Sequence, residues 1–248
     1  MSTLPTKLKK EPLIDGVFEI RFKSDFPAGG ILPGLLFGRL GGQATIEQLP
    51  VSQIPQQARD QDPNLQFAPL SRLDWENYYI NVGDRSLSVG FKYPYPGWGN
   101  FKPAIIKVME ALKDANVIKT VERYSHKYID LIPAVSLQEQ VALVNLDITL
   151  AGHTLKSEAF QLRLEIPVDD FIHAVQVVSS ATATLLTGES KQGLVVDVDT
   201  IAIQKSISFN ELLTGFSEKL EAIHQANKKV FFDCLNPETI AALEPEYE

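Results

Sequence analysis

The sequence predicts an α+β protein: a ferredoxin-like βαββαβ module at residues 1–135, followed at 136–248 by a four-stranded antiparallel β-meander that a long C-terminal helix covers. Three observations support this fold class. The 248 residues, 44% hydrophobic and 22% charged, suit one large globular domain or two small ones. The first half orders its periodicities as strand, helix, strand, strand, helix, strand. The second half alternates apolar and polar residues and then shows a long helical pattern.

The first predicted strand and helix lie before residue 43. In residues 17–23, three apolar residues alternate with charged ones, which is typical of a half-buried strand. The Gly-rich apolar segment 30–42 predicts a short helix. Its glycines Gly30, Gly34, Gly38 and Gly42 would form a smooth stripe that packs tightly on the sheet. The segment has neither the G-x-G-x-x-G nor the Walker pattern, so it does not predict phosphate binding.

The remaining elements of the module follow a proline-containing insertion. Residues 43–73 contain four prolines and predict a long irregular loop. Residues 78–82 and 86–93 flank turn residues and predict a hairpin. Apolar residues at helical spacing predict a helix over 101–116 that stops at its last residue, and the β-branched and aromatic run 120–132 predicts a strand.

The second half has a different texture, so we place the domain boundary between Pro133 and Gln140. Apolar alternation and β-rich composition predict four strands in a meander, at 142–150, 160–166, 174–186 and 193–204. Ser208 and Glu211 have the spacing of a capping box, which predicts that the long helix begins there. Asn236-Pro237 predicts the start of a last short helix.

The charge balance argues against nucleic acid as a partner. There are 23 Lys and Arg against 31 Asp and Glu, a net charge of −8, and a surface field of that sign repels phosphate groups. The densest basic group, Lys7, Lys9 and Lys10, keeps nucleic acid only as the weakest alternative. The chain has no apolar leader and no apolar run long enough to span a bilayer, so we expect a cytoplasmic protein without a membrane segment.

The sequence predicts no catalytic residue, no metal site and no cofactor. The single cysteine, Cys234, excludes an internal disulfide, and the four histidines have no metal-ligand spacing. Asp197 and Asp199 share one face of a predicted strand, and cross-strand ion pairs with Arg163 and Glu165 explain them more simply than a metal does. No Ser/His/Asp or Cys/His arrangement follows from the spacing.

Aromatic residues concentrate in the turn at 91–101. Tyr93, Tyr95, Trp98 and Phe101 stand there among prolines and glycines, and rigid aromatics on a turn are good anchors for a partner chain or a flat ligand. The alternative is that Trp98 and Phe101 fasten the following helix to the hairpin.

The long C-terminal helix carries more apolar surface than one covered sheet face requires. We expect it to form a homodimer or partner interface through Phe216, Leu220, Ile223 and Phe231, in addition to covering its own sheet. The alternative is that its C-terminal end packs inside the chain.

A set of short motifs is distributed over nearly the whole chain: Pro12–Ile14, Phe18–Phe22, Gly38-Arg39, Glu47–Pro50, Ile80–Gly83, Tyr95–Trp98 with Phe101, Glu122–Tyr124 and Tyr128–Asp130, together with His224 and Phe231. These motifs resemble a sporadically distributed, uncharacterised bacterial protein family of about this length. The resemblance is most specific in the Tyr-Pro-Gly-Trp element. It implies a standalone bacterial protein that is patchily inherited, and it adds no catalytic residue.

The sequence therefore favours a non-enzymatic interaction or regulatory protein, of the kind found as an antitoxin-like subunit or in a phage-defence cassette, which acts on a protein partner or as a homodimer. The alternative is a small-ligand-binding protein or enzyme that uses a groove between the sheet and the inserted loop, because a long loop in a compact domain is often functional. Arg85 and Arg123 would then be the first candidates to hold an anion.

Overall fold

The structure, a computed structural model, describes residues 4–41, 44–184, 188 and 190–247. It confirms a mixed α+β fold in which a large antiparallel sheet dominates. The chain divides into two compact units, each assembled from separate stretches. Unit 1 comprises residues 1–15, 127–200 and 224–248, and unit 2 comprises residues 16–126 and 201–223.

These units are not consecutive halves of the chain, and the boundary placed between residues 135 and 136 lies inside unit 1. The reason is the length of four elements, each of which has residues in both units. They are β2 (Leu13–Lys23), β7 (Thr120–Pro133), β12 (Ser190–Ser208) and α6 (Phe216–Cys234).

In unit 2 the hydrogen-bonded strand order is β7-β2-β6-β5-β4-β3. The predicted hairpin is β5 (Tyr78–Val82) and β6 (Ser86–Phe91), and β4 (Ser71–Trp75) and β3 (Ala44–Gln48) continue the sheet. The printed register pairs from β2 through β6, β5 and β4 to β3 are all antiparallel. The strand predicted at 17–23 is confirmed as part of β2, whose apolar residues Phe18, Ile20 and Phe22 are fully buried.

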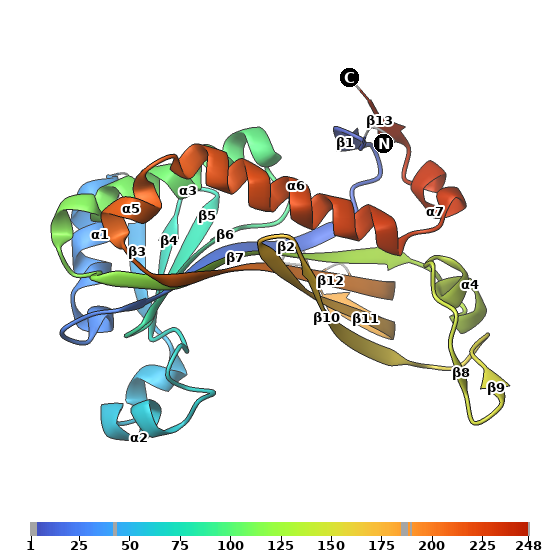
Figure 1. The fold of residues 1–248 in the computed structure, drawn as a ribbon, viewed down its shortest axis with the longest axis horizontal. Helices are drawn as coiled ribbons and strands as arrows, with labels where there is room; N and C mark the ends of the chain where they lie inside the picture. Colours follow the sequence, from blue (N-terminus) through green and yellow to red (C-terminus); the bar gives the residue numbers. More distant parts are fainter. Residues whose placement is uncertain (1–3, 42–43, 185–187, 189, 248) are drawn as a thin grey trace. The chain divides into compact units, whose positions relative to one another are not determined.

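The helices α1 (Leu32–Leu40) and α3 (Trp98–Leu112) contact each other and lie on one face of these strands (Figure 1). A short 3₁₀ turn, η1 (Ala28–Gly30), precedes α1. Another, η3 (Lys113–Ala115), follows α3. Asn116, the residue at which the sequence predicts the helix to stop, ends this turn in the left-handed conformation with φ 51°.

The prediction that residues 43–73 form an irregular loop is wrong for most of this stretch. This stretch contains β3, the 3₁₀ turn η2 (Pro50–Gln53), helix α2 (Gln56–Gln61) and the first residues of β4. The prolines do not interrupt these elements, because Pro50 begins η2 and Pro55 is the N-cap of α2.

In unit 1 the strand order is β10-β11-β12-β7, with β10 (Gln161–Val168) and β11 (Phe171–Thr184) paired antiparallel. The strand predicted at 142–150 is wrong. Helix α4 (Leu137–Ala142) occupies its start, because Ser136 and Glu139 form a capping box. Val144 forms only an isolated bridge to Leu235, and the last two residues pair as β8 (Thr149–Leu150) with β9 (His153–Thr154). The fourth strand of the sheet in this unit is therefore β7, which lies on the side of β12 away from β11, and not a strand at 142–150.

The C-terminal helix begins at the predicted capping box of Ser208 and Glu211, but it is interrupted. Helix α5 (Phe209–Leu213) ends before Gly215, which has φ 62°, and α6 then continues. The last helix, α7 (Pro237–Ala242), has Asn236 as its N-cap, as predicted. The short strands β1 (Lys7–Leu8) and β13 (Pro245–Glu246) pair near the two ends of the described chain. In the described part of the chain, no helix is both long and apolar enough to cross a membrane.

Candidate functional site

A hollow of about 500 Å³ opens in unit 2 where α1 begins beside β3. Its walls come from η1 and the start of α1, from β3 and later residues of the stretch 43–73, and from the turn between β5 and β6. The lining residues with a polar side chain are Gln48, Ser52, Arg59 and Asp84, and the others are Pro27, Gly29, Gly30, Pro33, Gly34, Ile46 and Leu70.

Glycines keep the α1 side of this hollow open. A Cβ atom on Gly30 or Gly34 would meet no other atom within 4 Å, so both positions border free space. Gly29 differs, because its Cβ would lie 2.9 Å from Leu70 Cδ1 and 3.0 Å from Asp84 Oδ1. Only glycine therefore lets η1 approach these two side chains so closely.

The glycine stripe of α1 consequently does not pack on the sheet, and that prediction is wrong. A Cβ on Gly38 would also meet nothing within 4 Å, and Gly42 lies outside the described residues. The helix packs instead through Leu32, Leu36 and Leu40, which follow one another at a spacing of four and are at most 5% exposed. The glycines stand on the opposite, open side.

A buried ion pair forms the polar wall of the hollow. Arg59 and Asp84 are each 9% exposed, and the distance from Arg59 Nη2 to Asp84 Oδ2 is 2.6 Å. Arg59 Nη1 also donates to the carbonyl of Ile54, which ties α2 to the residue two positions before it. Because both charges are paired and hydrogen-bonded, the wall is neutral and rigid. Sequence reasoning missed Arg59, since nothing local predicts that a cation in a proline-containing segment is buried.

Strand β3 forms one rim of the hollow and is an edge strand. In the strand order of the described residues it pairs with β4 on one side and stands last on the other, and four of its five residues are exposed. Ile46 is 41% exposed and lines the hollow. Three further large apolar side chains are exposed in and just before η1 and α1: Phe26 at 43%, Ile31 at 42% and Phe37 at 50%.

The aromatic turn contributes nothing to this hollow, although the structure describes all of residues 91–101. Phe101 is fully buried and stacks on Tyr78 with ring centroids 6.1 Å apart. Trp98 meets the His126 ring edge-on at 5.3 Å, and its Nε1 donates to Glu221 at 2.9 Å. These contacts support the alternative that Trp98 and Phe101 fasten α3 in place.

The two tyrosines of the turn are half-buried. The ring of Tyr95 lies 4.9 Å from that of Phe91, and Tyr93 precedes Pro94 through a cis peptide bond. Whether either tyrosine contacts a ligand stays a prediction.

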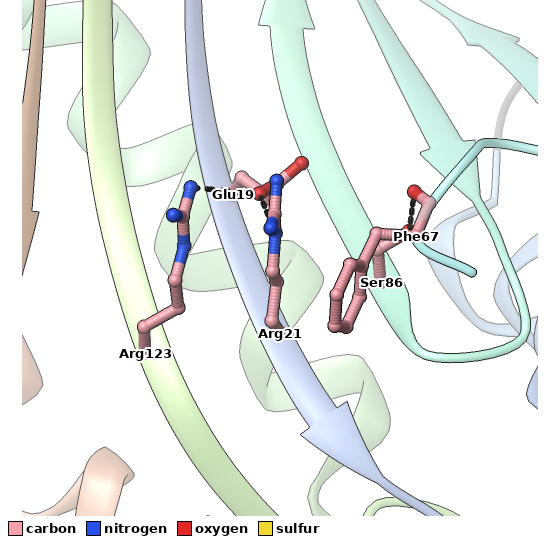
Figure 2. A network of polar contacts seen from close by, with 5 residues as sticks. All are labelled: Glu19, Arg21, Phe67, Ser86 and Arg123. Atoms are coloured by element: carbon pink, nitrogen blue, oxygen red, sulfur yellow. Dashed lines mark hydrogen bonds and ion pairs between the residues drawn. The ribbon is translucent and has the colours of Figure 1, made fainter. Parts of the chain in front are cut away.

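The two arginines predicted to hold an anion are not brought together. Arg85 pairs with Asp60 in α2 at 3.3 Å, and Arg123 Nη2 lies 3.3 Å from Glu19 Oε1. Arg21 Nε donates to the same Glu19 oxygen at 2.8 Å, so two guanidinium groups share one carboxylate (Figure 2). Each predicted arginine therefore already has a carboxylate partner.

Glu19 begins a polar row that crosses the sheet face opposite to the buried Phe18 and Ile20. Register pairs connect Glu19 to Ser88, Ser88 to Asn81 and Asn81 to Arg72. Asn81 Nδ2 donates to Ser88 Oγ at 3.4 Å, and Arg72 Nε donates to Asn81 Oδ1 at 2.9 Å. The row holds its own members in place and contains no paired nucleophile and base.

All four residues predicted to form an interface are buried within the chain. Leu220 and Ile223 are 0% exposed, and Phe216 and Phe231 are each 6% exposed. This burial supports the alternative that the helix packs inside the chain. An interface through these side chains would require the helix to leave its own sheet.

The described residues include His, Cys, Asp and Glu side chains, from which a metal site or a reactive thiol would be built. They contain no group of three or more His, Cys, Asp or Glu side chains suited to hold a metal ion. Asp197 pairs with Lys127 at 2.8 Å, whereas the predicted partner Arg163 pairs with Glu165 on its own strand β10. Burial raises the pKa of the Cys234 thiol to about 11, so it stays protonated and unreactive at neutral pH.

No family model matches the chain, and no curated protein matches it.

Proposed function

We propose that the protein is a non-enzymatic interaction protein that binds an extended segment of a partner protein along the free edge of β3. The observation that carries the proposal is the edge strand itself, exposed at four of its five residues and bordered by a hollow of about 500 Å³. An extended peptide that adds a strand to a sheet edge gains main-chain hydrogen bonds, and pockets for alternate side chains give it specificity.

The register of β3 identifies the backbone groups that such a peptide would use. Leu49 N donates to Leu70 O at 2.8 Å, which makes these two residues a hydrogen-bonded pair. Because such pairs alternate along an antiparallel ladder, Thr45 and Glu47 also bond to β4. The N–H and C=O groups of Ala44, Ile46 and Gln48 then face the free edge.

The hollow selects the side chains of the bound segment. Ile46 and Gln48 both line it, so a peptide paired with β3 would direct every second side chain toward the same hollow. Its walls are mainly prolines, glycines, Ile46 and Leu70, and its one ion pair is internally neutral. The preferred side chain is therefore apolar.

The fold is consistent with this use. We propose that unit 2 is a ferredoxin-like module in which β2, α1, β5, β6, α3 and β7 are the predicted elements and β3 and β4 lengthen the sheet beyond β5. The added strands create the exposed edge. The narrower toxin–antitoxin or phage-defence role stays a prediction, because it rests on the family resemblance alone.

The test begins with peptides selected on the full chain from a random ten-residue display library, followed by amide hydrogen exchange with the best binder. We expect the peptide to slow exchange at Ile46 and Gln48, whose N–H groups face the free edge. Ile46→Pro should abolish binding because it removes a free-edge donor without removing a bond to β4. Ile46→Lys, which keeps the donor but fills the hollow with charge, should weaken it.

Thr45→Ala is the matched control, since Thr45 is exposed on the same strand and bonds to β4. Its peptide affinity should equal that of the wild type. Peptides that bind with equal affinity to Ile46→Pro, or that leave the Ile46 and Gln48 amides unprotected, would refute strand addition at β3.

A small-ligand-binding protein is the second candidate, because the volume of the hollow lies within the range of about 300–1,000 Å³ that small-molecule sites occupy. A fragment that binds there should raise the melting temperature and change the environment of Leu70. It should leave the amide exchange of Ile46 and Gln48 unchanged, which separates the two functions.

A further inference from the structure

Strand β10 exposes an apolar face at the end of the sheet in unit 1. Leu164 is 49% exposed, Ile166 39% and Val168 44%, although all three alternate along one face of a regular strand. Their neighbours in register on β11 include Val175 and His173, which are 6% and 2% exposed. The apolar face of the sheet therefore continues onto β10, where the described chain leaves it uncovered.

Among the described strands, β10 stands last in the sheet, so its outer edge carries backbone hydrogen-bonding groups that no other described strand pairs with. Ser179 N donates to Phe160 O at 3.0 Å, so this pair is hydrogen-bonded, and the even-numbered residues of β10 accordingly bond to β11. The odd-numbered residues face outward. Pro167 agrees with this assignment, because a proline has no N–H to donate and is tolerated where its nitrogen faces a free edge.

The outward-facing residues include one cation and one anion placed symmetrically about Leu164. Arg163 and Glu165 lie on the sheet face opposite to the aliphatic residues, with side chains 49% and 65% exposed. If a second β10 strand pairs antiparallel with Leu164 opposite its own copy, each Arg163 lies opposite a Glu165 of the other chain. The aliphatic side chains of the two chains then continue one apolar surface.

Neighbouring registers lack this match. A two-fold centred on Arg163 would place two cations opposite each other, and one centred on Glu165 would place two anions opposite each other. A shift by one residue would bring aliphatic side chains to the charged face. Among the registers centred on residues 163 to 165, the one centred on Leu164 is thus the one that opposes unlike charges.

We propose that β10 is the contact between two copies of this chain, which join edge to edge in an antiparallel strand pair centred on Leu164. Arg163 and Glu165 exchange main-chain hydrogen bonds across the pair, and the N–H of Gln161 donates to the C=O of Pro167. Such a strand contact is small, so the dimer forms and dissociates with concentration rather than permanently. It is independent of the peptide site proposed on β3.

The first test is sedimentation equilibrium of the full chain over a wide concentration range. We expect a reversible monomer–dimer equilibrium that Leu164→Lys shifts to monomer by at least tenfold in dissociation constant, because it places two cations opposite each other. Ile203→Lys, at a position that is 63% exposed on another strand, is the matched control and should leave the equilibrium unchanged. A wild-type chain that is monomeric at every concentration would overturn the proposal, as would a dimer that Leu164→Lys leaves intact.

The second test fixes the register. Arg163→Glu and Glu165→Arg should each weaken the homodimer, because each opposes like charges. A mixture of the two variants should form a heterodimer, in which both opposed pairs are again Arg with Glu, and the double variant R163E/E165R should dimerise like the wild type. Circular dichroism verifies that every variant is folded. If the singles weaken the dimer and neither the mixture nor the double variant restores it, pairing centred on Leu164 is refuted.

Discussion

Replacing Phe231 by alanine distinguishes a core helix from an interface helix. Phe231 is 6% exposed and belongs to the hydrophobic core of unit 1. Its ring lies 5.2 Å from that of Phe232 at an interplanar angle of 68°, an edge-to-face arrangement. The cluster around it includes Val196, Val198 and Leu235, all at most 1% exposed.

The magnitude follows from this burial. A Phe→Ala change in a packed core costs about 3–5 kcal/mol, which includes the lost transfer free energy and the cavity left behind. The edge-to-face contact with Phe232 accounts for about 0.5–1.5 kcal/mol of that range. For a chain of this size each kcal/mol lowers the melting temperature by about 2–4 °C, so we expect a fall of about 6–20 °C.

The assay combines differential scanning calorimetry with light scattering. Lys229→Ala is the matched control, since it lies in the same helix and removes only an exposed ion pair with Asp233, worth about 0.3–0.5 kcal/mol. Phe231→Ala should lower the melting temperature far more than the control and leave the mass of the folded species unchanged. A variant with wild-type melting temperature and a smaller mass would refute the assignment of Phe231 to the core.

Substitutions at Asp130 and Gly193 test the packing of unit 1, and one at Gly38 in unit 2 is the contrasting case. Burial, with two neighbouring carboxylates, raises the pKa of Asp130 well above its ordinary value. Between the ordinary pKa and the raised one, the unfolded chain ionises this group while the folded chain keeps it protonated. The free energy of unfolding therefore falls as the pH rises through the folded pKa. Asp130→Asn should therefore raise the melting temperature more near pH 7 than near pH 4 in parallel thermal scans; equal effects at both pH values would contradict the assigned burial. Gly193→Ala should destabilise the chain strongly, because the new Cβ would lie 2.1 Å from the backbone oxygen of Ile132. Gly38→Ala should instead stabilise the chain by about 0.5–1 kcal/mol, because Gly38 lies within a helix and its new Cβ would meet no atom within 4 Å. Chemical denaturation measures both, and a harmless Gly193→Ala would show that β7 and β12 are not packed as described.

Local patterns in the sequence predicted several elements correctly, since their causes lie within a few neighbouring residues. The alternation around Ile20 defined a strand, and the reciprocal hydrogen bonds of Ser208 and Glu211 defined a helix start. The same kind of local signal was missed at Gly215, whose positive φ divides the C-terminal helix in two. At 142–150 alternation was misleading, because Val144 reaches the core through a bridge to Leu235 rather than through a strand.

The sequence by itself determined the mixed α+β class, the strand around Ile20 and the helix caps at Ser208 and Asn236, because hydrophobic periodicity and capping act over a few residues. The tertiary structure alone decided which surfaces stay open. The glycines of α1 look the same in sequence whether they pack or face free space, and Leu164 has the same pattern as the buried Val175 one strand away. Exposure depends on which strand is last in the sheet, and pairing between distant segments sets that order. For the same reason the candidate site beside β3 and the edge of β10 emerge only once the strands are assembled.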